Sequence, residues 1–500
     1  MNILRKKSVE QSIRDTEAPE HKLNKTLGPI DLIVFGIGVI IGTGIFVLTG
    51  NAAALHAGPA VVVSFVIAGI GCGLAALCYA EFASSVPVAG SAYTFSYASL
   101  GEFIAWIIGW DLILEFLVGA ATVSIGWSQY FVEILKGIGI TLPAAIAGGS
   151  GSVVNVPAAI IVLLLTCVIT LGVRLSSRFN LVVTSIKLTV VLFFIIFGLF
   201  FIKASHWTPF IPPAQPVKGG GTSLLETPLL QVFLGHPQTF GWGGVVTGAA
   251  TVFFAYIGFD IVATTAEETR KPQRDMPIGI IGSLLICTVL YIAVSLVMTG
   301  IVPYTQLDTA APMATAFAAI GQSWASVLVS IGALCGLTAV IMILMMGQSR
   351  IFFAMSRDHL LPRWFAHVHP SFGTPYRISI LTGIVVAIVA ALTPITVVSE
   401  MVNIGTLLAF VLVSLGVIIL RRTQPNLRRA FRTPLVPLLP ILALLVCLYM
   451  ALYLQVVTWI RFVVWLLIGI IIYFAYSVHH SRLAHEEIEG AGEETVQEVR

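Results

Sequence analysis

Long apolar runs recur along this chain, and they limit its fold more than any other feature. About twelve can be placed, each of roughly the ~20 residues that a helix needs to cross the hydrocarbon core of a membrane. They lie near residues 30–55, 59–83, 103–133, 156–172, 179–203, 244–268, 277–301, 322–349, 377–393, 397–420, 437–456 and 459–478. Only 10% of the residues are charged, whereas about a quarter are charged in an ordinary soluble chain. The sequence predicts an all-α polytopic membrane protein.

Lysine and arginine gather on one side of these runs. Twenty-two of the 27 basic residues fall in the two terminal segments and in every second loop, and only four fall in the other loops. Cytoplasmic loops carry the excess of basic residues, so we expect a protein of the cell membrane with both termini cytoplasmic. The polar first 29 residues leave the first span to act as its own insertion signal. The net charge of +3 therefore reflects topology, and nucleic-acid binding has no support.

Several kinds of site are not indicated. The six cysteines all lie inside expected spans, where small core residues are a better interpretation than disulfides or a zinc site. All ten histidines lie in loops or termini, and no HExxH occurs, so we expect neither a metal nor another cofactor. Because no acid–base or metal constellation stands out, the chain is not expected to be an enzyme.

Two of the expected spans contain residues that weaken a helix at mid-membrane. The first has Gly42, Thr43 and Gly44 near its centre, and the sixth has Gly258 after Ala255–Ile257. Glycine costs ~1 kcal/mol against alanine in a helix interior, and hydrocarbon offers no water to a freed backbone group. Interrupted helices five spans apart are typical of transporters built from inverted repeats, where they point to the substrate site. Close helix packing through small residues is the alternative.

A break at mid-membrane exposes backbone groups of opposite polarity. Freed N–H groups around Gly42–Gly44 would hold a carboxylate, and freed carbonyls near Phe253–Tyr256 would hold an ammonium, because each helix end carries a partial charge of ~0.5. Glycine matters here because a Cβ would block close approach to the backbone. A ligand that bears both charged groups a few Å apart is an α-amino acid, so the sequence predicts an amino-acid substrate inside the lipid bilayer.

Six motifs then occur in order along the chain. They are GIGVIIGTGIFVLTG (36–50), VPVAGSAYTFSY (86–97), GWDLILEF (109–116), FAYIGFD (254–260), EETRKPQRDMPIGI (267–280) and SRDHLLP (356–362). Together they resemble the amino acid–polyamine–organocation superfamily, in particular bacterial permeases related to the cationic amino acid transporters, over roughly residues 25 to 475. The resemblance implies a core of two inverted five-helix repeats with helices 1 and 6 unwound at the substrate, followed by two more helices.

The resemblance also implies a division of the chain into six parts. They are a cytoplasmic N-terminal segment (1–29), the first repeat (30–203), an extracellular loop (204–243), the second repeat (244–420), two additional transmembrane helices (421–478) and an acidic cytoplasmic tail (479–500). The proline and glycine content of the long loop predicts flexibility, although TPLLQVFLGHPQTF could form a short surface helix. The loop is longer than the resemblance leads us to expect.

Carried onto this sequence, the family's motifs imply substrate-binding residues in both broken helices. Those expected at the carboxylate are Ile41, Gly42, Thr43 and Gly44, and those expected at the amine are the carbonyls of Phe253, Phe254 and Tyr256, with Ile257 nearby. Phe253 is either an aromatic gate over the ligand or a core residue.

One basic residue, Lys187, lies inside the fifth span. An intramembrane lysine costs at least ~2.5–3.5 kcal/mol on insertion scales, so it is a functional candidate by default. Desolvation disfavours the charged amine, which would let Lys187 exchange a proton during a transport cycle. The resemblance implies that its ammonium replaces the sodium ion of sodium-coupled relatives and bridges the first helix to the fifth, which favours proton coupling. A snorkelling or structurally paired lysine is the alternative.

Four further residues are candidates for the selectivity of the pocket. Asp111 and Glu115 share one face of the third span, and Gly119 follows one turn further on. Glu115 either tunes the preference for cationic side chains or is a structural anion. Met345 or Met346 would shorten the pocket if it faced inward; packing in the core or against lipid is the alternative.

These features favour a secondary transporter that takes up small neutral or cationic L-amino acids by alternating access with proton coupling. An amino-acid exchanger is one alternative. The other is an amino-acid-sensing membrane subunit, as in germinant receptors, that does not accumulate its ligand. The sequence does not identify the preferred amino acid, the oligomeric state or an accessory membrane subunit.

Overall fold

The computed structural model describes residues 5, 25–86, 88, 91–148, 152–172, 177–216, 224–234, 238–369 and 374–483. The expectations for most of the N-terminal segment, for the glycine run at 219–221 and for the acidic tail beyond residue 483 lie outside the described residues.

Helices account for all twelve expected spans. Eight of the described helices are long and apolar enough to cross a membrane, and four apolar helices are shorter. The unbroken spans are α4 (Val61–Ser85), α6 (Glu102–Gly137), α7 (Val156–Thr170), α8 (Ser177–Gly198), α12 (Pro272–Ile301), α14 (Ser323–Arg357), α15 (Tyr376–Leu392), α16 (Ile395–Thr423), α17 (Leu438–Leu452) and α18 (Val456–Ile472). The all-α polytopic prediction is confirmed.

The first and sixth spans are each built from several pieces. The first consists of α2 (Pro29–Ile40), a π-helical turn (Gly44–Leu48), α3 (Thr49–Ala52) and a second π-helical turn (Ala53–Ala57). The sixth consists of α10 (Gly241–Val252), a 3₁₀ turn (Phe253–Tyr256), α11 (Phe259–Val262) and a second 3₁₀ turn (Ala263–Glu268).

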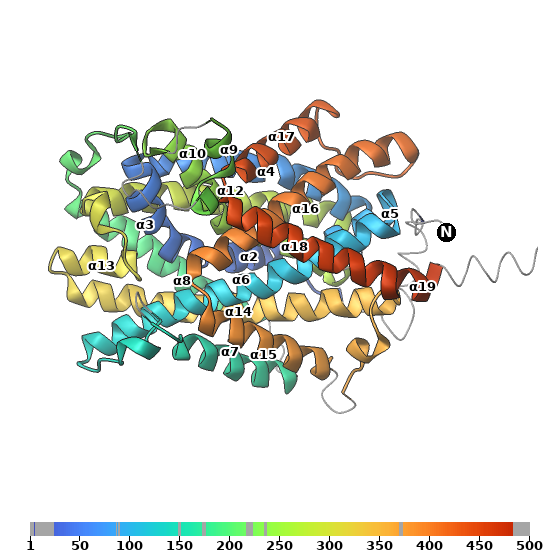
Figure 1. Ribbon diagram of the computed structural model, residues 1–500, viewed down its shortest axis with the longest axis horizontal. Coiled ribbons are helices and arrows are strands. Elements are labelled where there is room, and N and C mark those ends of the chain that lie inside the picture. Colours follow the sequence, from blue (N-terminus) through green and yellow to red (C-terminus); the bar gives the residue numbers. More distant parts are fainter. Residues whose placement is uncertain are drawn as a thin grey trace, which may run out of the picture.

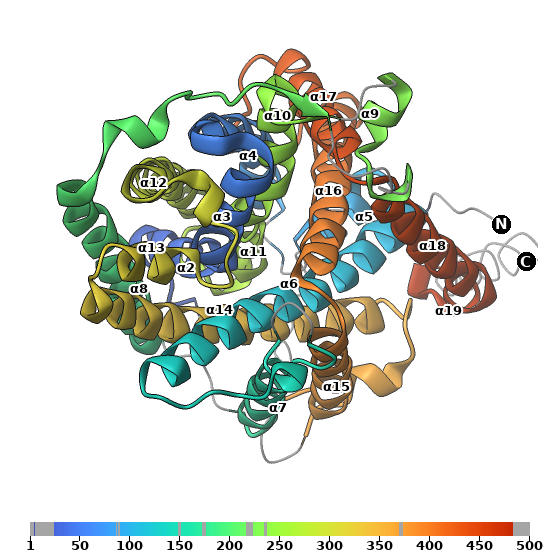
Figure 2. The ribbon, with the colours of Figure 1, turned by 60° about the vertical axis from the view of Figure 1, so that its left-hand side comes forward.

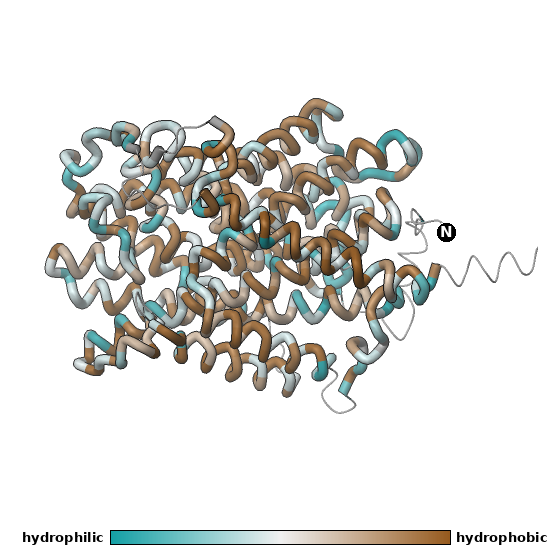
Figure 3. Tube along the Cα trace, viewed as in Figure 1, coloured by the Kyte–Doolittle hydropathy of each residue, from teal (hydrophilic) through white to brown (hydrophobic). Residues whose placement is uncertain are grey.

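The helices run roughly along the long axis of the molecule (Figure 1). Apolar residues dominate the middle of the bundle, and hydrophilic residues gather at its two ends (Figure 3). This is the pattern that a bilayer selects, because only the middle of the bundle meets hydrocarbon. We call the end at which α2, α6 and α12 begin and α14 and α16 end the basic end; its loops and helix termini carry Arg270, Lys271, Arg274, Arg350, Arg357, Arg421, Arg422, Arg428, Arg429 and Arg432.

The broken spans lie on the inside of the bundle. Helices α2 and α10 pack against α12 and α4 respectively, and α6 and α14 cross beside them near the centre of the view in Figure 2. Helices α7 and α15 pack together on the periphery, and α18 lies on the outer side of α6 and α16. In an apolar stretch of 18 residues from the sixth span, 89% of the residues are buried inside the protein. In the corresponding stretch of the span that contains α18, only 22% are buried.

Several short elements outside the spans were not predicted. They include α5 (Ala92–Ser99) at the basic end and α13 (Pro312–Ala319) at the opposite end. Helix α13 lies against α3 of the first span, where Gly50 leaves no room for a Cβ beside Pro312. Each of these helices is short and is flanked by polar residues in the sequence, so neither produces a recognisable apolar run.

The long loop is attached to the bundle, although its composition predicted flexibility. It contains α9 (Leu229–Leu234), inside the stretch where a short surface helix was considered, and a two-residue strand pair, β1 (Gln215–Pro216) with β2 (Gln238–Thr239). Leu229 N–H donates to the Leu454 carbonyl, and Val456 N–H donates to the Thr227 carbonyl. Main-chain hydrogen bonds to the turn between α17 and α18, which composition does not reveal, hold this part of the loop in place.

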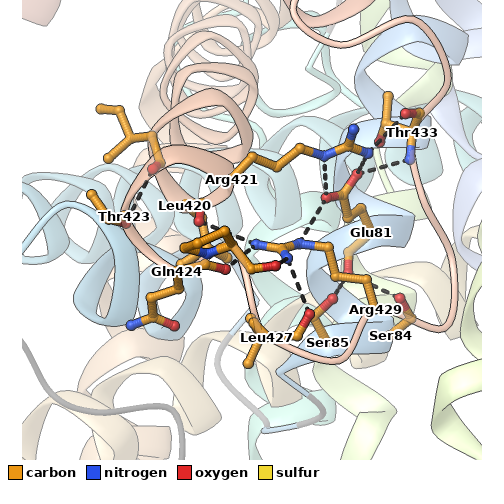
Figure 4. Close-up of polar contacts among 12 residues, drawn as sticks. Glu81, Ser84, Ser85, Leu420, Arg421, Thr423, Gln424, Leu427, Arg429 and Thr433 are labelled. Carbon is orange, nitrogen blue, oxygen red and sulfur yellow. Dashed lines mark hydrogen bonds and ion pairs between the residues drawn. The ribbon is translucent and has the colours of Figure 1, made fainter.

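At the basic end, Glu81 fastens the α16–α17 loop to α4 (Figure 4). Its carboxylate accepts two hydrogen bonds from the Arg421 guanidinium, at 2.9 and 2.7 Å, and one from the Thr433 N–H at 2.8 Å. The Arg429 Nε lies 3.4 Å from the same carboxylate. Glu81 is only 3% exposed. We call Glu81, Arg421, Arg429 and Thr433 the Glu81 clamp.

The second arginine of the clamp also caps a helix. The Arg429 guanidinium donates to the carbonyls of Leu420 and Gln424 at the carboxyl end of α16. A cation there balances the negative pole of the helix. The clamp therefore holds two arginines with one glutamate and one helix terminus.

We predict that Glu81→Gln destabilises the protein by about 3 kcal/mol, because removing the charge of one partner leaves two arginines facing an amide in a mostly buried site. The apparent melting temperature of the purified protein in detergent measures this effect. Arg422→Gln, at an exposed arginine one position beyond Arg421, is the matched control. Equal melting temperatures for the two variants would contradict a stabilising role for the clamp.

Candidate functional site

Both expected helix breaks are present. Helix α2 ends at Ile40, and Ile41 takes an extended conformation with ψ of 96° before helical structure resumes. In the sixth span α10 ends at Val252, and Gly258 has φ of +128°, a conformation that favours glycine, just before α11. The expected interruption of the first span near Gly42–Gly44 is confirmed.

The two breaks touch each other through glycine. A Cβ on Gly44 would lie 2.2 Å from the Ala255 Cα, and a Cβ on Gly258 would lie 2.8 Å from the Val39 side chain. Neither contact has room for any side chain, because real Cβ atoms do not approach other atoms this closely. The glycines therefore let the two backbones meet at the level where both helices are interrupted.

Lys187 of α8 binds the backbone that the first break exposes. Its Nζ donates to the Gly38 and Ile41 carbonyls, each at 2.7 Å, and the side chain is fully buried. The last carbonyls of a helix have no partner within it and carry its negative pole, which is where a cation is stabilised. Gly336 of α14 makes room for the lysine, since a Cβ there would lie 2.6 Å from the Lys187 Cε.

Tyr291 of α12 binds both breaks at once, and sequence reasoning missed it. Its hydroxyl lies 2.6 Å from the Ile40 carbonyl and 2.7 Å from the Ala255 carbonyl. A hydroxyl has one proton to donate, so the two carbonyls share it. Asn403 of α16 acts similarly, donating to the Ala250 carbonyl in α10 at 2.8 Å. A polar residue in the middle of an apolar span was the available signal for both.

A cavity of about 20 Å³ lies beside the two breaks. Seven of the expected site residues line it: Gly42, Thr43, Gly44, Glu115, Gly119, Phe254 and Ile257. A space of this size holds about one water molecule. Gly42 and Gly119 differ from Gly44 in their packing, because a Cβ on either would meet its nearest neighbour at an ordinary 3.7 Å.

Two polar side chains that line this cavity have no hydrogen-bond partner in the described part of the chain. They are the Thr43 hydroxyl and the Glu115 carboxyl, both at most 1% exposed. Thr406 lies near the Glu115 carboxyl without a hydrogen bond of ordinary geometry. A buried polar group without a partner costs about 1–3 kcal/mol, so both groups are suited to hydrogen-bond a ligand, and the Glu115 carboxyl can also hold a proton.

The other expected residues lie around the cavity and do not line it. The Ile41 N–H already donates to the Ile37 carbonyl. Phe253 is fully buried against the Phe410 ring, with a centroid distance of 5.7 Å. The Tyr256 hydroxyl donates to the Phe65 carbonyl, and Met345 is buried in α14.

A larger cavity, of about 280 Å³, lies at the basic end between α2, α8, the end of the sixth span and α14. Met346 lines this cavity and not the central one. Arg350 and Glu268, which also line it, form an ion pair at 3.1 Å that joins α14 to the end of the sixth span. Within the described residues, no group of His, Cys, Asp or Glu is arranged to hold a metal ion.

Two broken helices that meet beside a small buried cavity are typical of membrane transport proteins of the broken-helix type. The amino acid permease family model matches residues 27–476, and the chain belongs to this family. The resemblance seen in the sequence motifs is thereby confirmed.

Curated relatives give a more detailed comparison. The chain is 45% identical to the methylthioribose transporter and 46% identical to the branched-chain amino acid permease BcaP, both of Bacillus subtilis (strain 168), over 96% of this chain and 99% of each relative. It is 36% identical to the vacuolar cationic amino acid transporter 4 of Arabidopsis thaliana over 85% of this chain and 68% of that protein.

We predict that Gly42→Ala and Gly44→Ala both abolish transport but differ in stability. Gly42→Ala should melt like the unmodified protein, because the added Cβ makes only ordinary contacts. The same Cβ should block transport, because it fills space in the central cavity. Gly44→Ala should be destabilised by about 1–3 kcal/mol, because the two backbones must separate.

Gly73→Ala is the control, since a Cβ there has nothing within 4 Å. Uptake assays and melting temperatures of the three variants test this prediction. Normal transport by Gly42→Ala would contradict a role of this backbone in binding.

Proposed function

We propose that this protein is a secondary active transporter that takes up L-amino acids with protons, by alternating access, across the cell membrane. The observation that supports it best is the pair of buried, partnerless polar side chains, Thr43 and Glu115, beside two helix breaks in a member of the amino acid permease family. Both termini would be cytoplasmic, which agrees with the basic residues at one end of the bundle.

In this proposal the substrate binds between the two breaks. Its carboxylate is held by backbone N–H groups of Gly42–Gly44, and its ammonium by the carbonyls of Phe253, Phe254 and Tyr256 with Ile257 close by. A cavity of about 20 Å³ is too small for any amino acid, so α2, α10 or the pieces following them must move apart to admit one. The wider cavity at the basic end would then be the release path, controlled by the Arg350–Glu268 pair.

Lys187 would couple this movement to protons. Its two hydrogen bonds end on carbonyls at the break of the first span, so a change in its charge changes the force on α2. A protonated ammonium is strongly attracted to the negative pole of α2, and a neutral amine only weakly. Proton release would therefore loosen α2 from α8.

Glu115 would act on the substrate side chain. Its carboxyl faces the cavity together with Gly119 and has no partner among the described residues. A cationic side chain would find its counter-ion there, while a small neutral one would leave Glu115 protonated. Met345 and Met346, which do not line the central cavity, have less support as selectivity residues.

The methylthioribose transporter supports a second candidate substrate. This relative is as similar to the chain as the branched-chain permease is. Methylthioribose is a neutral thio-sugar that lacks both the carboxylate and the ammonium. Competition therefore separates the two candidates.

We expect several unlabelled L-amino acids, and not methylthioribose, to inhibit the counterflow of labelled alanine into proteoliposomes loaded with alanine. Arginine, lysine, leucine, isoleucine and valine are the informative members of a twenty-amino-acid panel. Counterflow of labelled methylthioribose without any counterflow of alanine would support the second candidate. Binding of an amino acid without counterflow would instead indicate a sensing subunit.

We predict that Lys187→Ala abolishes accumulation driven by an inward proton gradient while retaining a measurable fraction of amino-acid counterflow, which needs no gradient. Retained counterflow shows that the variant is folded. Lys136→Ala, at a lysine whose side chain is 58% exposed, is the matched control. Undiminished accumulation by Lys187→Ala would refute the coupling role, and gradient-independent accumulation in the unmodified protein would favour an exchanger.

A further inference from the structure

A groove lies on the outside of the bundle, between the first turns of α12 and the loop that joins α16 to α17. Its volume is about 620 Å³. It is lined mainly by Arg274, Pro277, Ile278, Ile281 and Leu285 of α12 and by Phe431 of the loop. We call it the α12 groove. The transport function proposed above makes no use of it.

The α12 groove has the polarity and the length of one membrane leaflet. Its α12 residues follow helical spacing along one face, with the charged residue at the basic end and only apolar residues after it. From Arg274 to Leu285 a helix rises about 16 Å, close to half of the ~30 Å hydrocarbon core. Ile278 and Leu285 are 39% and 61% exposed, so the groove faces the bilayer and not the protein interior.

The charged end of the groove has an excess of positive charge. Arg274 is exposed, and its guanidinium makes no hydrogen bond or ion pair with the residues that the structure describes. Lys271 precedes it on the same helix terminus and is also exposed. The nearby acid, Asp275, is 5% exposed and does not line the groove. The Glu81 clamp, by contrast, occupies Arg421 and Arg429. Among the described residues that line the groove, the arginine is Arg274.

The second wall of the groove is held in place before any ligand arrives. Phe431 lies between Arg429 and Thr433, and both of these bind Glu81. A preformed wall reduces the ordering cost of binding. Gly282, which also lines the groove, contacts Ile33 of α2, where a Cβ would lie 3.1 Å from the Ile33 side chain. The groove is therefore adjacent to the broken span as well as to the loop.

We propose that the α12 groove binds one anionic phospholipid from the leaflet at the basic end. Its phosphate lies at Arg274, and one acyl chain lies along Ile278, Ile281 and Leu285 against Phe431. Charge complementarity favours this ligand, because a basic cluster at the membrane surface attracts anionic lipids, with about 1 kcal/mol per basic residue. A zwitterionic lipid would gain the apolar contact without the charge.

The proposal is tested by lipid binding to the purified full-length protein, measured by native mass spectrometry with phosphatidylglycerol and phosphatidylcholine as probes. We expect saturable binding of phosphatidylglycerol in preference to phosphatidylcholine. Arg274→Gln should weaken it about fivefold, and Arg274→Lys should largely retain it. Ile281→Trp, which fills the groove, should also weaken it, with Leu285→Trp as a second variant should the first fail to fold.

Matched controls separate the groove from the general basic surface. Arg422→Gln removes an exposed arginine of the same end, and Val289→Trp adds a ring at a 66% exposed position of α12 beyond the groove; both should bind normally. Equal losses in Arg274→Gln and Arg422→Gln, equal binding of the two lipids, or normal binding by the groove-filling variants would each overturn the proposal. So would a photo-crosslinker at position 281 that captures a protein subunit from membranes and no lipid.

Discussion

A backbone polar group inside a bilayer must find a partner within the protein, and this requirement shapes the centre of the molecule. Interrupting two spans at mid-membrane exposes carbonyls that water cannot reach. Lys187 binds those of Gly38 and Ile41, Tyr291 those of Ile40 and Ala255, and Asn403 that of Ala250. The partners come from α8, α12 and α16, three helices of the surrounding bundle. The broken helices can exist because unbroken ones supply the missing partners.

The same requirement explains why glycine is concentrated where the breaks cross. Gly44 and Gly258 bring the two backbones together, and neither could carry a Cβ. Gly42 and Gly119 border the small central cavity without being needed for packing. Glycine thus has two separate tasks here, close contact between the broken helices and open backbone toward the cavity, and only the structure distinguishes them.

Much of this architecture could be read from the sequence, and the limits were physical. Apolar runs located all twelve spans, and Gly42–Gly44 with Gly258 located both breaks, because these signals are local in the chain. Tyr291, the Glu81 clamp and the position of Met346 depend on which faces of distant helices meet. Helical spacing alone could not assign those faces, since spans buried on several sides show little periodicity. Lys187 was found because a cation in an apolar run is conspicuous, and its carbonyl partners agree with a bridge between the first and fifth spans.

The arrangement at Tyr291 has a mechanical consequence. One hydroxyl proton lies between two acceptors, so each carbonyl holds only a share of a hydrogen bond. When either broken helix withdraws, the other takes the proton fully, and the pair loses less than a complete bond. A shared hydroxyl at Tyr291 therefore lowers the cost of separating the two broken helices at that contact, compared with two complete hydrogen bonds.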